Sequence, residues 1–318
     1  MRYYLLFTFV TLASFAFASV SAALAVCAAW PRVRPRLDGC ASQWRTHVLF
    51  ALRALPSVAG LLSAGAVATG FLRHEPRHTT EEPGIVLCVA AVLAAGLVGV
   101  IAVRGARDAV RAVCFARLAG RCRQWTHRHG ASISVVETGY PVAAVAGMFR
   151  PRLLMSSRIL SACTPEELDA IVAHEQAHIR AHHNVVRAVM LGLPDPLAVL
   201  PTGREIEAAW ALAAEETADD EATGLSEEKR AALAATLLHV ARMADDGPPS
   251  WMPALAFYQG HDLQHRVRAL LDAPVRGGAP VRALPPTVLA LALAVLAWSD
   301  DSSGILHRAV EWMVRSLP

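Results

Sequence analysis

The feature that most constrains the fold of this 318-residue chain is a set of long, uncharged, apolar stretches. A helix that crosses a bilayer needs about 20 such residues, with about 17 tolerated. The composition agrees, since hydrophobic residues make up 54% of the chain, charged residues 18%, and the mean hydropathy is +0.36. We therefore predict a mainly α, multi-pass membrane protein with about four spans, the last being the shortest: Tyr3–Trp30, Ala54–Leu72, Ile85–Val103 and Pro285–Trp298.

Charged loops predict the orientation of these spans. The loop after the first span contains four arginines and one aspartate. In the loop after the second span, acids outnumber arginines. Six arginines lie from residue 104 to residue 123, after the third span. Arginine-rich loops stay in the cytoplasm. The amino terminus is therefore predicted to lie outside a bacterial-type cell membrane, with the long segment after Val103 on the cytoplasmic side and lipid around the spans.

The first stretch has an alternative interpretation as a cleaved signal peptide. Arg2, an apolar run and small residues around Ala18 to Ala23 fit that pattern. The apolar run continues to Trp30, however, and cleavage would place the first arginine-rich loop outside. Both observations favour a retained helix.

The spans divide the chain into three predicted parts. About 180 residues separate the third span from the fourth, which is the size of one ordinary domain. The parts are a three-helix membrane region over residues 1–103, a cytoplasmic domain over 104–282, and a fourth span with a short extracytoplasmic tail over 283–318. The net charge of +3 does not suggest a nucleic-acid partner.

The six cysteines form no C-x-x-C pair, so a zinc finger or a thioredoxin-like motif is not indicated. Because none has the spacing typical of metal ligands, we interpret them as buried or free thiols. They are Cys27, Cys40, Cys88, Cys114, Cys122 and Cys163.

The predicted cytoplasmic domain contains a well-marked helix start. Thr164 can cap the helix, Pro165 suits its first position, and Glu167 completes a capping box. On the helix that follows, His174 and His178 are four residues apart and project from one face, so both can reach a single metal ion.

Glu175 lies beside the first histidine and can take a proton from a water at the metal. This H-E-x-x-H pattern predicts a catalytic centre with one Zn²⁺ per chain. The next histidines, His182 and His183, are interpreted as solvated or interfacial.

A catalytic zinc requires a third protein ligand. A second predicted helix, from Ile206 to Ala222 with Gly224 as its C-cap, carries Glu215 and Asp219 on one face. Glu215 can bind the metal, while Asp219 can hold a histidine ring by its free N–H. The alternative register, Glu216 with Asp220, stays open, as does a solvated acidic face.

These segments together resemble the gluzincin peptidases of membranes. Two branches are similar: the CAAX-prenyl-protease and heat-shock membrane protease type, and the BlaR and MecR antirepressor type. The second is favoured by the order of spans and by several segments: Tyr140–Ser157, Thr164–Leu168, the helix with His174–His178, and His265–Leu271. About twenty residues follow the fourth span, so no penicillin-binding sensor domain is expected and beta-lactam sensing is not carried over.

The resemblance implies an α+β, zincin-like domain in which a strand beside the zinc helix binds an extended peptide. Val142, Ala143, Ala144 and Val145 are the candidates, with an ordinary core strand as the alternative. Peptide hydrolysis also needs a group that steadies the oxyanion, and His261 and Arg266 are candidates.

Three functions remain open after these observations. The chain could be a protease for a cytoplasmic regulator, a quality-control protease for membrane proteins, or a signal transducer with structural zinc. Glu175 argues against the third, because a structural zinc needs no base beside its first ligand.

Overall fold

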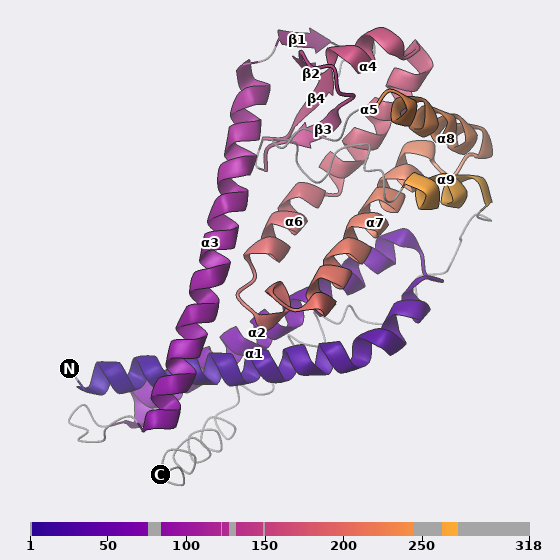
Figure 1. Ribbon diagram of the computed structural model, residues 1–318. Coiled ribbons are helices and arrows are strands. Elements are labelled where there is room, and N and C mark those ends of the chain that lie inside the picture. The colour runs from indigo at the N-terminus through magenta and orange to yellow at the C-terminus, as the bar shows by residue number, and fades with distance from the viewer. Residues whose placement is uncertain are drawn as a thin grey trace.

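The computed structural model describes residues 2–75, 84–121, 123–126, 132–148, 150–244 and 263–272, which form a mostly helical protein with one small sheet (Figure 1). The elements are α1 (Arg2–Leu37), α2 (Ser42–His74), α3 (Ile85–Arg121), β1 (Arg123–Thr126), β2 (Ser132–Val136), β3 (Ala143–Ala146), β4 (Arg152–Ser156), α4 (Ser157–Ala162), α5 (Pro165–Arg180), α6 (His183–Gly192), the 3₁₀ turn η1 (Pro196–Ala198), α7 (Pro201–Thr223), α8 (Glu227–Arg242) and α9 (Leu263–Asp272). The predicted fourth span, Pro285–Trp298, lies outside the described residues.

Among the described residues, three helices are long and apolar enough to cross a membrane, over Arg2–Leu37, Ser42–His74 and Leu87–Arg107. Their outward faces carry large exposed apolar side chains, among them Phe17 at 70% and Val92 at 67%. An exposed apolar surface of this kind marks a site of contact with lipid or another apolar partner. The three helices therefore indicate membrane association.

The first two of these helices pack along each other, and α3 packs on α1 (Figure 1). Where α1 and α2 approach, the Ser19 hydroxyl donates a hydrogen bond of 3.0 Å to the Pro56 carbonyl. Gly60 permits this close contact, because a Cβ at that position would lie 2.2 Å from Ser19 Oγ.

Helix α3 connects this helix layer to the sheet. It runs unbroken from Ile85 to Arg121, past Val103, and reaches β2, β3 and β4 at its far end (Figure 1). The predicted domain boundary between residues 103 and 104 therefore falls inside one continuous helix, and the boundary itself stays a prediction.

The sheet has the strand order β1-β2-β4-β3, with β3 at one edge. β2 pairs with β4 in parallel, whereas the two outer pairs are antiparallel. One face packs on α5, α8 and α9 through a core that includes Ile133, Met155, Ile171 and Leu237. This core holds α5 against the edge of the sheet.

A second core joins α1 and α2 to α6 and α7. Trp30 and Leu49 from the first pair of helices pack with Leu197, Ile206 and Trp210. The helices of the predicted peptidase domain thus pack directly on the membrane-type helices.

Buried polar pairs reinforce this contact. Arg53 of α2 is fully buried and bonds to Asp195 at 2.8 Å and to Glu207 of α7 at 2.8 Å. About two turns earlier on α2, Arg45 bonds to Glu216 at 2.5 Å. Breaking a buried pair by removing one partner costs about 3–5 kcal/mol, so these arginines fix how α7 lies on α2.

Candidate metal centre

Helix α5 begins as the sequence predicts. Thr164 is the N-cap, Pro165 occupies the first turn, and Thr164 and Glu167 form a reciprocal capping box with hydrogen bonds of 2.8 and 3.3 Å. This start fixes the rotation of the helix, and it places His174 and His178 in the buried face.

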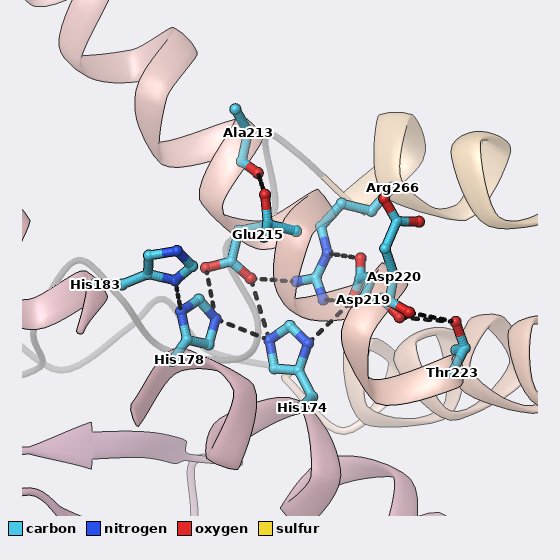
Figure 2. A network of polar contacts seen from close by, with 10 residues as sticks. His174, His178, His183, Ala213, Glu215, Asp219, Asp220, Thr223 and Arg266 are labelled. Carbon is cyan, nitrogen blue, oxygen red and sulfur yellow. Dashed lines mark hydrogen bonds and ion pairs between the residues drawn. The ribbon is translucent and has the colours of Figure 1, made fainter. Parts of the chain in front are cut away.

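Helix α7 supplies the third donor. It ends at Gly224, which adopts φ of +55° as the predicted C-cap. Nine residues earlier, Glu215 faces the two histidines of α5 (Figure 2). The donor atoms of His174, His178 and Glu215 all lie within 4.8 Å of one another.

The distances within this cluster are short. His174 Nε2 lies 3.1 Å from His178 Nε2, and it lies 3.4 Å from Glu215 Oε2. The other carboxylate oxygen, Oε1, lies 3.5 Å from His178 Nε2. Two imidazole nitrogens and one carboxylate meeting at a point form a donor set that suits a catalytic zinc.

Asp219 holds the first histidine from behind. Its Oδ1 lies 2.9 Å from His174 Nδ1, and this contact leaves His174 Nε2 directed at the cluster (Figure 2). Burial alone would lower the pKa of His174. Hydrogen bonds to Asp219 and Glu215 have a larger, opposite effect and raise the pKa to about 9. A carboxylate behind a histidine ligand is the arrangement that orients metal-binding imidazoles in proteins.

Arg266 of α9 lies between the two carboxylates rather than at an open site. Its guanidinium bonds to Asp219 at 2.7 and 2.9 Å, and to Glu215 at 2.9 Å. Burial raises the pKa of both acids, and the charge of Arg266 then brings the pKa of each below its ordinary value. Arg266 therefore lies where a counter-ion to the two carboxylates would lie. His261, the other candidate for steadying the oxyanion, lies outside the described residues.

His183 is a residue of the site that its sequence pattern did not identify. Its side chain is buried, with Nδ1 2.8 Å from His178 Nδ1 (Figure 2). Its ring lies edge-on to the ring of Trp210, with the centroids 5.9 Å apart. Burial lowers the pKa of His183 to about 3, so the ring is neutral and can accept the N–H of His178. That hydrogen bond leaves His178 Nε2 free to bind a metal.

The turn that buries His183 depends on its neighbour. His182 is exposed and adopts φ of +53°, a left-handed conformation that reverses the chain at the end of α5. The interpretation as a solvated or interfacial residue fits His182, but it is wrong for His183. The sequence showed only two adjacent histidines after a helix, and this pattern does not indicate which side chain is buried.

Glu175 is buried beside the cluster, with 2% of its surface exposed. Burial raises the pKa of its carboxyl, while His174 and His178 oppose that rise. A carboxylate with a raised pKa is suited to take a proton and to return it.

The predicted peptide-binding strand forms the edge of the sheet. Val142 faces β4, since its carbonyl accepts from Ser156 N at 2.8 Å. The carbonyls of Val145 and Gly147 point the other way and accept from the side-chain amide of Asn184 at 3.1 and 3.3 Å. The free edge of β3, which includes Ala143 and Ala144 as predicted, is therefore in contact with the segment that follows α5.

Fold and site together define a candidate metallopeptidase: a zinc-type donor set on two packed helices, a buried base and an edge strand. Comparison with family models agrees, since the model of Peptidase family M48 matches residues 114–204. The match supports an M48 metallopeptidase family and a peptidase activity, and M48 peptidases are generally zinc-dependent. It contains His174 and His178 and ends before Glu215. Comparisons with curated proteins and with solved structures found no match.

Proposed function

We propose that this chain is a membrane-anchored zinc endopeptidase that hydrolyses peptide bonds of a cytoplasmic or membrane protein. The observation that carries the proposal is the convergence of His174, His178 and Glu215 within 4.8 Å, next to the buried carboxyl of Glu175. The M48 match supports the metallopeptidase part of the proposal, and the three apolar helices support the membrane part.

The two histidines and Glu215 would hold the zinc ion. When bound there, zinc supplies Lewis-acid chemistry, which acidifies a water molecule and polarises the scissile carbonyl. Glu175 takes the proton of the attacking water and delivers it to the leaving amine. Its raised pKa suits both transfers, because the carboxyl must accept the proton and then release it.

The remaining residues of the site hold these groups in place. Asp219 and His183 each bond to the Nδ1 of one histidine ligand, so both imidazoles present Nε2 to the same point. Arg266 balances the negative charge of Asp219 and Glu215, which would otherwise repel each other in a buried site. These are positioning residues, since they act through the proposed ligands.

The edge strand β3 is the proposed docking site for the substrate backbone. An extended peptide could add to this edge through main-chain hydrogen bonds, and Asn184 would then release the carbonyls of Val145 and Gly147. The strand is supported as a binding site by its edge position and by its contact with α5.

A cytoplasmic regulator is the favoured substrate, as the resemblance to the BlaR and MecR type implies. The specific observation in its favour is the pair of buried arginines by which α2, a membrane-type helix, contacts α7, the helix that carries Glu215. A change in the membrane helices would reach the catalytic helix directly through these contacts.

Metal removal tests the proposal. Detergent-purified full-length protein is incubated with unfolded casein and with itself, before and after chelation, and again after zinc is restored. We expect cleavage to stop on chelation and to return with zinc. Cleavage that persists without metal would contradict a zinc peptidase, and efficient cutting of casein would favour quality control over a dedicated regulator.

A further inference from the structure

A second group of metal-type donors lies near the start of helix α5, away from the catalytic cluster. The donor atoms of Cys163, Glu167 and His239 all lie within 4.8 Å of one another, as do those of the catalytic group. They come from three elements: the C-cap of α4, the third residue of α5 and the last turn of α8.

Each member is held by a feature of the fold. Cys163 ends α4, with its backbone N–H donating to the Ile159 carbonyl at 3.0 Å. Glu167 is fixed by the capping box, which uses Oε2 and leaves Oε1 directed at His239 Nδ1 at 2.8 Å. Because α8 packs on α5 in the main core, His239 is kept beside both.

The donor set identifies the chemistry of the ligand. A thiolate, an imidazole and a carboxylate bind borderline-soft divalent ions such as Zn²⁺ and Co²⁺, whereas Mg²⁺ and Ca²⁺ prefer oxygen donors alone. His239 keeps 40% of its side chain exposed and Glu167 keeps 21%, so an ion can enter from solvent. A water molecule can fill the fourth position.

We infer that Cys163, Glu167 and His239 form a second binding site for a zinc-type divalent ion, separate from the catalytic centre. The ion replaces the Glu167–His239 hydrogen bond with two coordinate bonds, and Cys163 gives up its thiol proton to solvent. Because burial and the nearby Glu167 raise the pKa of Cys163 to about 11, binding at this site strengthens as the pH rises.

The site also has a structural consequence for the peptidase. Glu167 and His174 are seven residues apart on α5, which places them about 10 Å apart along the helix and on nearly the same face. An ion at the second site therefore ties α8 and the end of α4 to the helix that carries the catalytic histidines. Occupancy of this site would report the supply of the metal that the catalytic centre also uses.

Cobalt titration of the full-length protein in detergent distinguishes the two sites. The catalytic donor set contains no thiolate, so thiolate-to-cobalt charge-transfer absorption reports the second site alone. We expect this band in the wild type and in His178→Ala, and we expect its loss in Cys163→Ser. Cys40→Ser, a change at another half-buried cysteine, is the matched control and should keep the band.

Metal content completes the test. Bound cobalt should be about two ions per chain in the wild type and about one in either Cys163→Ser or His178→Ala, as expected for two independent sites. His239→Gln, a change at a partly exposed residue, serves as a second variant if Cys163→Ser does not fold. The inference would be overturned if the wild type lacked the thiolate-to-cobalt band. It would also be overturned if the band were unchanged in both Cys163→Ser and His239→Gln. Loss of metal in Cys163→Ser but not in His178→Ala would instead count against the catalytic centre.

Discussion

The two acidic faces of helix α7 have similar side chains and different partners. Glu215 and Asp219 face α5 and α9, where they meet His174 and Arg266. One residue further along, and so about 100° around the helix, Glu216 and Asp220 face α2.

On that second face, Glu216 bonds to Arg45 at 2.5 Å and Asp220 accepts from Ser42 at 2.8 Å. The other oxygen of Glu216 lies 2.8 Å from His265 Nε2, so both of its oxygens are used in contacts away from the paired histidines of α5. By contrast, the two oxygens of Glu215 lie 3.4 and 3.5 Å from Nε2 of His174 and His178. The geometry therefore favours Glu215 over the alternative Glu216 as the third ligand.

Neutralising one acid on each face of α7 should give the largest difference between the two faces. Glu215→Gln should remove the catalytic metal and reduce proteolysis more than about 100-fold, since ligands matter more than their outer partners. Glu216→Gln should keep both the catalytic metal and the proteolytic activity. Metal analysis and a proteolysis assay on the two variants would check this, and the reverse result would assign the third ligand to Glu216.

The contact with α2 should matter for stability rather than for metal binding. Arg45→Met leaves Glu216 buried without its main counter-ion, which should cost about 3–5 kcal/mol of folding free energy. Arg34→Met is the matched control, because the Arg34–Glu205 pair is largely exposed and should contribute at most about 1 kcal/mol. Thermal unfolding in detergent would measure both, and equal shifts would contradict the account.

Asp219 should have an intermediate effect on the metal. Asp219→Asn keeps the size of the side chain but weakens its hold on His174, and the expected loss is about 10–100-fold in metal affinity or activity. Asp220→Asn, on the other face, should leave metal affinity unchanged. A competition titration with a zinc chelator measures the affinities of both, and comparable losses would show that α7 acts as a unit.

The smallest expected effect comes from Ser42. Ser42→Ala removes the hydrogen bond to Asp220 and should cost about 1 kcal/mol of stability. Burial raises the pKa of Asp220, and loss of the Ser42 hydrogen bond should raise it further. Denaturant unfolding of Ser42→Ala and of the wild type would measure this loss of stability. A loss of bound zinc in Ser42→Ala would instead assign Ser42 to the metal site.

Local signals predicted the part of the site that depends on neighbours in sequence. Thr164, Pro165 and Glu167 fix where α5 begins, and Gly224 fixes where α7 ends, so the faces of both helices followed from short patterns. The H-E-x-x-H spacing and Glu215 could be identified for the same reason.

The residues that depend on tertiary packing could not be predicted in this way. Arg53 directly precedes the predicted span Ala54–Leu72 in the sequence, yet its side chain is buried against Asp195 and Glu207. Arg266 reaches the site from α9, and His183 reaches it because of a left-handed turn at a non-glycine residue. In each case the partner lies on another element or the backbone adopts a conformation that the residue type disfavours.

Comparing zinc content and proteolysis in the wild type and in Glu175→Gln tests directly whether the chain is a zinc peptidase with Glu175 as its base. Glu228→Gln, a change at an exposed glutamate of α8, is the control for loss of a charge. We expect all three proteins to bind zinc equally and only Glu175→Gln to fail to cut itself or a test protein. A Glu175→Gln variant that still cuts, or a wild type without zinc, would contradict the central claim.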